Sequence, residues 1–505
     1  MRLDNIDTVY FLGVGGIGMS ALARFFLLQG KQVHGYDLTP TEITEQLINE
    51  GTIIHFQEDV SQIPSSINWV IYTPAIPKEH EEYRYFIEKK IPLLKRSEML
   101  GLICKDHPTI AVAGTHGKTT TTAIVTQIMV SGEEKSPSNF EGVSNEVRRG
   151  SLYKNNILSF IGGISKNINS NLLCEENFDT VIVEADEYDR SFLTLHPQVA
   201  IITSMDADHL DVYGKHEHLV ESFQLFANQI KPDGVLIIND EIAHLIQHPN
   251  KITYGFSDTA QYKISDIQYY PSKTVFDLTI YKLPRLTSFN TSSKFEGDFS
   301  SPHSQITSSA HHLIINLSGK HNVLNAVAAL AACIEFSLWK EKTMDRNHLI
   351  DIFQNRLSEF SGVKRRFDIR VERDDFVYID DYAHHPKEIK AFLDAVKNCY
   401  PNKKITGVFQ PHLYSRTRDF AQEFAEVLEV LDEIILLNIY PAREQPIEGI
   451  TSDYLLSLIQ NKNKKLLKKD ELFNYLKQNK LEVLLTMGAG DIDKMVKDIE
   501  LLVGN

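Results

Sequence analysis

The stretch from Thr109 to Thr122 reads TIAVAGTHGKTTTT. An apolar run of β character enters a glycine turn, Gly-Lys-Thr follows, and the next residues suit a helix. Strand, glycine loop and helix are the parts that hold a polyphosphate, because small residues let backbone N–H groups approach the oxygens and the helix points its positive end at them. Lys118 can add a cation, and the Thr119 hydroxyl can ligate Mg²⁺. The stretch therefore predicts a phosphate-binding loop in an α/β fold.

The loop departs from the usual pattern at one position. The first glycine, five residues before Gly117, is replaced by Val112, so the loop has the compressed form Gly-x-x-Gly-Lys-Thr and starts at Gly114. Gly-Lys-Thr alone is common, and the plain alternative is a glycine-rich turn that binds nothing. The β run before the loop and the helix after it favour phosphate binding.

Length and charge bound the remaining possibilities. A chain of 505 residues is too long for one core, and its length predicts three or four domains. A net charge of −15 argues against nucleic acid, whose binding rests on a basic face that neutralises phosphates. It is compatible with small anionic ligands, which need only local N–H groups and a few cations.

The expected cellular compartment is inferred from membrane, secretion and cysteine signals in the sequence. We expect no membrane partner, because no apolar run approaches the length of a membrane span, and no signal peptide, because the first residues lack its apolar core. The four cysteines lie far apart without a Cys-x-x-Cys pair, which indicates thiols in a reducing compartment. The expected location is the cytoplasm.

A second glycine loop lies near the N-terminus. A β run at residues 8–12 enters Gly13-Val-Gly-Gly-Ile-Gly18, a helical segment follows, and Asp37 ends the next strand about twenty residues on. This spacing is the dinucleotide fingerprint, so NAD is one interpretation; a Rossmann-like turn that binds another nucleotide, or only packs a helix, is the other. A later strand ends at Thr73-Pro-Ala75, where a parallel sheet lines its ligand crevice.

Two acidic strand ends follow the phosphate loop. A buried-type strand at residues 178–183 delivers Glu184-Ala-Asp-Glu-Tyr-Asp, and a second strand at 199–204 is followed by an Asp-rich segment with His209. In the sheet of a phosphate loop such ends meet the metal, so we expect divalent-cation ligation by Glu184 and His209. A solvated acidic loop and a structural histidine are the alternatives. The polar stretches 131–156 and 287–309 read as surface insertions, the second on a small antiparallel excursion.

The last third of the chain alternates strands and helices. Strands at 376–379, 405–409, 434–437 and 483–486 each end in polar residues with aromatic, histidine or arginine content. We expect these ends to form one crevice. No Ser/His/Asp spacing indicates a nucleophile on the protein.

Taken in order, the motifs are distinctive: A-G-T-H-G-K-T-T-T, E-A-D-E-x-D, D-x-D-H-L-D, G-K-H-N-x-x-N-A, G-x-x-R-R-F-D, D-D-Y-x-H-H-P and F-Q-P-H-x-Y-S-R-T-R. Over essentially the whole chain this series resembles the Mur ligase family. D-D-Y-x-H-H-P and H-x-Y-S-R-T resemble the alanine-adding members. The resemblance implies ATP-dependent ligation of L-alanine to the carboxylate of UDP-N-acetylmuramate through an acyl phosphate, for peptidoglycan synthesis.

The resemblance also implies three α/β domains: a Rossmann-like domain for the UDP substrate at 1–106, a central P-loop domain for ATP at 107–338, and a Rossmann-like domain for amino acid and ATP at 339–505. It implies small-molecule substrates, ATP and two Mg²⁺ ions as cofactors, and a monomer or homodimer. The first glycine loop would then hold pyrophosphate without redox chemistry.

Site residues follow from the same resemblance. The expected ATP contacts are Gly114, Thr115, His116, Gly117, Lys118, Thr119, Thr120, His321, Asn322, Asn325 and Asp381. The expected UDP-substrate contacts are Gly15, Gly16, Ile17, Gly18, Asp37, Thr73 and Ala75. The expected metal ligands are Thr119, Glu184 and His209. The expected amino-acid contacts are Tyr382, His412 and Arg416, and the catalytic residues Lys118, Arg366, His384, His385 and Arg416, with either histidine as the base.

The chain departs from the family pattern in places. No lysine lies between Glu184 and His209, so we expect no carbamylated lysine, and Leu413 stands where some alanine ligases have arginine. Glu184-Ala-Asp-Glu-Tyr-Asp also resembles the ligase that recycles murein tripeptide, which stays the nearest alternative. An NAD(P)-dependent oxidoreductase and a non-catalytic nucleotide-binding regulator are alternatives of other classes.

Overall fold

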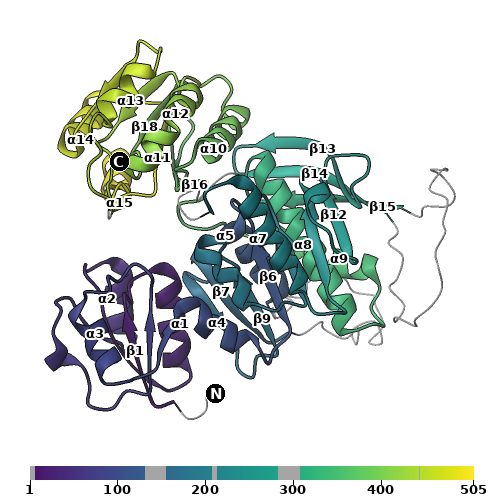
Figure 1. The fold of residues 1–505 in the computed structure, drawn as a ribbon. Coiled ribbons are helices and arrows are strands. Elements are labelled where there is room, and N and C mark those ends of the chain that lie inside the picture. The colour runs from purple at the N-terminus through teal and green to yellow at the C-terminus, as the bar shows by residue number, and fades with distance from the viewer. Residues whose placement is uncertain (1–5, 131–154, 207–212, 282–307, 443, 505) are drawn as a thin grey trace, which may run out of the picture. The chain divides into compact units, whose positions relative to one another are not determined.

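The computed structural model describes residues 6–130, 155–206, 213–281, 308–442 and 444–504. The chain divides into two compact units. Unit 1 comprises Met1–Asp266, Asp277–Leu313 and Leu324–Ser358, and unit 2 comprises Ile267–Phe276, Ile314–Val323 and Glu359–Asn505. Three sheets carry helices on their faces, as expected for an α/β protein (Figure 1).

The first sheet has five parallel strands in the order β3-β2-β1-β4-β5. Its strands and helices are β1 (Thr8–Leu12), α1 (Ile17–Leu28), β2 (Gln32–Tyr36), α2 (Glu42–Asn49), β3 (Ile53–His55), β4 (Trp69–Tyr72), α3 (Glu81–Glu88), β5 (Leu93–Lys95) and α4 (Arg96–Cys104). Alternate residues of β1 enter separate cores, Val9 and Phe11 with α1 and Tyr10 and Leu12 with Phe86 of α3. The sheet is therefore covered on both faces, and its glycine loop lies at the carboxyl end of the central strand β1.

The second sheet has ten strands in the order β15-β14-β13-β12-β11-β10-β6-β9-β7-β8. Its strands are β6 (Thr109–Ala113), β7 (Ile157–Ser165), β8 (Ser170–Cys174), β9 (Thr180–Glu184), β10 (Val199–Ile202), β11 (Val235–Asn239), β12 (Lys251–Gly255), β13 (Tyr262–Tyr270), β14 (Lys273–Tyr281) and β15 (Ser308–Ile315). The accompanying helices are α5 (Lys118–Met129), α7 (His216–Asn228), α8 (Lys320–Lys340) and α9 (Arg346–Ser358). β6 is fully buried and pairs in parallel with β10 and β9, so the ends of all three strands meet at one edge.

The third sheet has six strands in the order β16-β17-β21-β18-β19-β20, with β16 antiparallel to β17. Its strands are β16 (Asp368–Glu372), β17 (Val377–Asp381), β18 (Ile405–Phe409), β19 (Glu433–Leu436), β20 (Lys464–Leu466) and β21 (Val483–Met487). Its helices are α10 (Pro386–Cys399), α11 (Tyr414–Asp419), α12 (Ala421–Leu428), α13 (Ser452–Leu458), α14 (Lys469–Gln478) and α15 (Asp493–Gly504). The four strands expected to share a crevice are neighbours in this sheet, so their carboxyl ends share one edge.

One sequence-based statement is wrong. Helix α8 is long and apolar enough to cross a membrane by length and composition, although no apolar run was expected to approach that length. However, 83% of its apolar window is buried inside the structure. A core helix of a globular protein has this character, because it is apolar on all sides.

Arg24 ties α1 to β8 within unit 1. Its side chain, 8% exposed, donates to Asn171 Oδ1 at 2.5 Å and to Glu50 Oε2 at 2.8 Å. Asn171 in turn donates to the Ile17 carbonyl and the Ser20 hydroxyl. Removing the guanidinium therefore leaves a buried amide oxygen without its donor.

We predict that Arg24→Met lowers the free energy of unfolding by about 1–3 kcal/mol, because a buried acceptor loses its hydrogen bond. Thermal and urea unfolding followed by circular dichroism measure the change. Lys390→Met serves as the control, since Lys390 is 65% exposed and pairs with Asp394 at the surface. Equal stability of the two variants would contradict the prediction.

Candidate active site

The phosphate loop is built by close backbone approaches. Gly114 has φ +135°, and a Cβ there would lie 2.0 Å from Thr203 Oγ1; Gly117 has φ +82°, and a Cβ there would lie 2.5 Å from Asn325 Oδ1. Both positions therefore require glycine. Val112 pairs with Ile201 and Glu184 in the sheet, so the strand runs on where a longer loop would already have begun. The compressed form follows from this extension.

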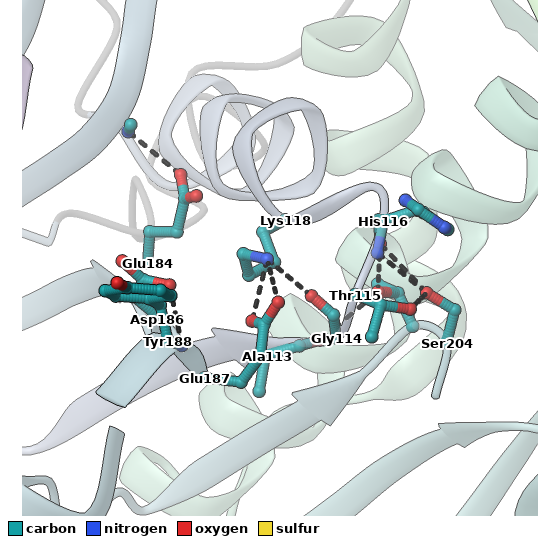
Figure 2. Close-up of polar contacts among 12 residues, drawn as sticks. Ala113, Gly114, Thr115, His116, Lys118, Glu184, Asp186, Glu187, Tyr188 and Ser204 are labelled. Carbon is teal, nitrogen blue, oxygen red and sulfur yellow. Dashed lines mark hydrogen bonds and ion pairs between the residues drawn. The ribbon is translucent and has the colours of Figure 1, made fainter. Parts of the chain in front are cut away.

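Residues after β10 hold the loop from the side. The Ser204 hydroxyl accepts the His116 N–H at 2.8 Å and contacts the Thr115 hydroxyl at 3.0 Å (Figure 2). Thr203 donates to the His116 carbonyl at 2.5 Å. In the described part of the chain no side chain caps α5, which begins at Lys118. The first N–H groups of a helix have no partner within it, so this end is suited to an anion.

Three carboxylates act on the charge of Lys118. Its Nζ contacts Glu187 Oε2 at 2.7 Å and donates to the Gly114 carbonyl at 2.7 Å (Figure 2). Burial alone lowers the pKa of Lys118, but the carboxylates of Glu187, Asp186 and Glu184 outweigh it and raise that pKa. The side chain is therefore a fixed cation beneath the loop.

Thr119 and Glu184 form a pair of hard oxygen donors. The Thr119 hydroxyl donates to the Glu184 carboxylate at 3.0 Å, and the Gly162 N–H donates to the same carboxylate at 3.0 Å. A hydroxyl beside a carboxylate at a phosphate loop suits Mg²⁺. The third expected ligand, His209, lies outside the described residues. In the part of the chain that the structure describes, no group of three or more His, Cys, Asp or Glu side chains is placed so that it could hold a metal ion.

Two asparagines of α8 differ in what they contact. Asn325 lies at the loop, where its Oδ1 accepts from Thr121 at 3.2 Å. Asn322 donates to the Ser318 carbonyl at 2.8 Å, which is a contact within unit 2. The structure thus brings Asn325 to the phosphate loop. Thr120, also an expected ATP contact, is buried in the first turn of α5.

A cavity of about 250 Å³ in unit 1 joins the first glycine loop to the acidic strand end. The expected residues that line it are Gly16, Ile17, Gly18, Thr73 and Glu184, and other lining residues include Arg96, Gly162 and Asp186. Arg96 pairs with Asp186 at 3.2 Å. The cavity can therefore hold a ligand between a glycine loop and a carboxylate-bearing strand.

Three further residues expected at the substrate lie elsewhere around this loop. Asp37 Oδ2 accepts the Gly15 N–H at 2.7 Å, which fixes the loop from behind. Ala75 donates its N–H to the Thr73 hydroxyl at 3.4 Å. Neither Asp37 nor Gly15 nor Ala75 is among the residues that line the cavity.

Two adjacent aspartates at the end of β17 brace the basic turn in unit 2. Asp380 accepts from Arg365 Nε at 3.0 Å and from the Thr486 hydroxyl at 2.6 Å. Asp381 accepts the N–H groups of Phe367 at 2.6 Å and Ala383 at 2.7 Å. Burial raises the pKa of Asp381 to about 7, with Arg366 and the two N–H groups opposing. Asp381 therefore stabilises this turn through two backbone contacts, and its expected place near a ribose stays a prediction.

Arg365 and Arg366 have different surroundings. The Arg365 guanidinium is held by Asp380 and by the Gly488 carbonyl at 2.6 Å. The Arg366 guanidinium lies 5.0 Å from the Tyr382 ring centre and 3.8 Å from a Glu388 oxygen. The Arg366 side chain is 30% exposed against 20% for Arg365, so Arg366 is the more exposed cation of the pair.

His384 and His385 also separate. His384 Nδ1 lies 3.1 Å from Glu388 and 3.1 Å from the Tyr382 carbonyl. His385 is 2% exposed, and its Nδ1 accepts the Lys387 N–H at 3.3 Å as the cap of α10. The structure brings Tyr382, His384 and His412 together, with ring centres 5.2 and 6.0 Å from that of His384.

The third strand end adds His412 and Arg416. His412 stacks on Tyr440 with ring centres 5.8 Å apart. Arg416 lies in the short helix α11, whose start is fixed by Ser415, because its N–H and hydroxyl both donate to Glu444, at 3.0 and 2.5 Å. The amino-acid residues expected from sequence therefore follow the ends of two strands of one sheet, β17 and β18, which lie on either side of β21.

His321 belongs to the same unit. Its imidazole lies next to Gly319, where a Cβ would be 2.8 Å from the ring. Burial lowers the pKa of His321 to about 4, with Arg366 adding to the effect and Glu388 opposing it. The ring is therefore neutral at neutral pH.

Sequence reasoning missed the carboxylates that hold other side chains. Glu187 anchors Lys118, Glu388 contacts His384 and Arg366, and Glu444 fixes Ser415. A signal existed only for Glu388, which follows His384 by four residues at the start of a helix, where side chains of that spacing meet.

These features are typical of an α/β enzyme that uses a nucleotide. They are a phosphate loop with an acidic neighbour, a second glycine loop at a cavity, and a third sheet with His and Arg at its strand ends. Three family models match the chain: the Mur ligase family catalytic domain at residues 8–108, the Mur ligase middle domain at 112–333 and the Mur ligase glutamate ligase domain at 365–490. The chain belongs to the Mur ligase family.

Individual proteins refine this. The chain is 44% identical to UDP-N-acetylmuramate–L-alanine ligase of Flavobacterium psychrophilum over 505 residues, which cover 99% of each chain. It is similar to the solved structure of UDP-N-acetylmuramate-alanine ligase MurC from Thermotoga maritima, with TM-score 0.72 and 26% identity over 97% of this chain and 98% of that one. The murein peptide ligase of Psychrobacter arcticus shares the fold, with TM-score 0.63 and 18% identity over 99% of each chain.

His321 gives a testable pH dependence. Because its folded pKa lies below the ordinary value of 6.5, the unfolded chain takes up the proton first, and stability falls as the pH drops from 6.5 towards about 4. In wild-type protein the free energy of unfolding should therefore fall by up to about 1.4 kcal/mol for each pH unit in this range, and we predict that His321→Gln removes this dependence. Urea unfolding of both proteins at a series of pH values measures the difference. Parallel curves would show that the imidazole is not held neutral.

Proposed function

We propose that this chain ligates L-alanine to the carboxylate of UDP-N-acetylmuramate, with conversion of ATP to ADP and phosphate, in peptidoglycan precursor synthesis. The observation that carries the proposal is the 44% identity over 99% of both chains to an enzyme of that name. The held lysine and the Thr119–Glu184 pair at the phosphate loop support the use of ATP. We further propose that the enzyme acts in the cytoplasm as a monomer or homodimer, without nucleic acid or membrane.

The proposed division of labour follows the three sheets. Residues 1–106 hold the UDP substrate, 107–338 hold ATP, and 339–505 hold the amino acid and complete the ATP site. The cavity beside Gly16 and Gly18 supports the first assignment, because a glycine loop at a helix start suits a pyrophosphate. This reassigns the dinucleotide fingerprint from a redox cofactor to a substrate, and Asp37, which holds Gly15, supports that change.

The chemistry requires activation, because a carboxylate is a poor acyl donor. A carboxylate oxygen of the sugar substrate attacks the γ-phosphorus of ATP, the bond to ADP breaks, and an acyl phosphate forms. The amine of alanine then attacks the acyl carbon, and phosphate leaves. Lys118 and the N-terminus of α5 neutralise the charge of the phosphates, and Arg366 binds the acyl phosphate. Arg416 binds the carboxylate of alanine, together with Tyr382 and His412.

The donor set at the loop fits Mg²⁺. Thr119 and Glu184 would hold one ion, and His209 is proposed for a second. Bound Mg²⁺ supplies charge neutralisation for the phosphate oxygens. Glu184 is oriented for this by the N–H of Gly162 and the hydroxyl of Thr119, at 3.0 Å each.

We predict phosphate release from purified protein with ATP and Mg²⁺ only when UDP-N-acetylmuramate and L-alanine are both present. Lys118→Met is expected to lower this rate by at least about 100-fold, since it removes a cation that stabilises transition-state charge. A coupled assay for phosphate measures both proteins.

The same assay separates the alternatives. No release with alanine, but release with L-Ala-γ-D-Glu-diaminopimelate, identifies the recycling ligase. Binding of NADH without ATP hydrolysis identifies the oxidoreductase, and ATP binding without turnover identifies a regulator. Each of these outcomes contradicts the proposed function.

Gly162 offers a test of the metal ligands. A Cβ at this position would lie 2.0 Å from Glu184 Oε2. We predict that Gly162→Ala displaces the carboxylate and raises the Mg²⁺ concentration for half-maximal turnover by roughly tenfold, since a displaced ligand weakens metal affinity by that order. The KM for L-alanine should stay unchanged. An unaltered Mg²⁺ requirement would remove Glu184 from the metal site.

A further inference from the structure

The contacts of the paired histidines distinguish a structural ring from a reactive one. His385 is buried, caps α10 through Nδ1, and meets Phe420 edge-on with ring centres 4.8 Å apart. An Nδ1 that accepts a hydrogen bond leaves the proton of the neutral ring on Nε2. His385 therefore has no ring nitrogen available to take a proton while it caps the helix.

His384 has the opposite arrangement. Its Nδ1 faces two acceptors, Glu388 Oε2 and the Tyr382 carbonyl, both at 3.1 Å. A nitrogen between two acceptors carries the proton, so in the neutral ring the lone pair is on Nε2. This tautomer is assigned from the partners of the ring. His384 Nε2 is thus the nitrogen that can act as a base.

Glu388 holds both the backbone and the ring of His384. Its Oε2 also accepts the His384 N–H at 3.1 Å, and its Oε1 lies 3.8 Å from Arg366. Tyr382 and His412 are the other titratable side chains that face the ring, each edge-on. Glu388 is 13% exposed in its side chain, so water competes little for its oxygens.

We propose that Glu388 is a positioning residue for amide formation: it fixes the His384 ring with Nδ1 protonated and Nε2 ready to take a proton from the incoming amino acid. The inference rests on the proposed function. A carboxylate that accepts from one ring nitrogen orients the imidazole and makes the other nitrogen a better base.

The step balances as follows. The α-ammonium group of alanine gives one proton to His384 Nε2, and the freed lone pair forms the C–N bond to the acyl carbon. The C–O bond to phosphate then breaks, and its electron pair leaves with the phosphate. A second proton passes from the nitrogen to the departing phosphate, and His384 later returns its proton to water.

Hydroxylamine gives a readout that a merely structural role would not produce. It is largely unprotonated at neutral pH, so it attacks the acyl phosphate without a base and forms a hydroxamate. We expect Glu388→Gln to slow amide formation with alanine on the order of tenfold, and His384→Ala by about 100-fold or more. Hydroxamate formation should stay near the wild-type rate in both variants. Asp394→Asn is the matched control, because Asp394 lies on the same helix and forms an exposed ion pair with Lys390. It should leave both rates unchanged.

The double variant His384→Ala with Glu388→Gln completes the test. If Glu388 acts through His384, the double variant is no slower than His384→Ala alone. The positioning role is overturned if the rate losses of the two single variants multiply in the double variant. It is also overturned if Glu388→Gln slows amide and hydroxamate formation equally. A normal hydroxamate rate shows that a variant is correctly folded. If the wild-type protein releases no phosphate with alanine, the proposed function fails and this inference with it; normal wild-type turnover limits any failure to Glu388.

Discussion

The phosphate loop depends on the buried ion pair between Lys118 and Glu187. The two groups meet at 2.7 Å, and the Glu187 side chain is fully buried. Two charges taken out of water hold together only if their geometry and remaining hydrogen bonds are good, and loss of one partner leaves a buried charge uncompensated. The Gly114 carbonyl supplies a further acceptor for Lys118. The pair fixes the lysine directly under the turn that it serves.

Sheet register makes this pair possible. Glu187 follows β9, and Lys118 opens the helix after β6, which is the neighbour of β9 in the sheet. The other neighbour, β10, delivers Thr203 and Ser204 to the opposite side of the loop. Because parallel strands end at the same edge, three segments distant in sequence converge there. Val112 stays in the strand for the same reason, since its paired neighbours extend as far as it does.

Sequence alone predicted the α/β class, the parallel strands and both glycine loops, because a buried parallel strand is a continuous apolar run and a tight turn needs glycine. Thr8–Leu12 and Ile405–Phe409 match the expected bounds. Glu187 and Glu388 were not predicted. A carboxylate after a strand reads the same whether it is solvated or buried against a lysine, and only the folded chain supplies its partner. The different contacts of His384 and His385 were hidden for the same reason.

The adjacent arginines of unit 2 illustrate how such carboxylates decide which cation remains for a ligand. Arg365 is bound by Asp380 and the Gly488 carbonyl, and both partners lie at the ends of neighbouring strands. It is therefore part of the scaffold, and the chain needs it even without substrate. Among the described residues, the nearest carboxylate to Arg366 lies at 3.8 Å, and the Tyr382 ring lies close to both guanidinium groups, 5.0 Å from Arg366 and 5.3 Å from Arg365. A ring face attracts a guanidinium without occupying its N–H donors, so Arg366 keeps those donors for an anion. The whole chain has a net charge of −15. A local anion site still forms where one cation, here Arg366, is not bound closely by a carboxylate.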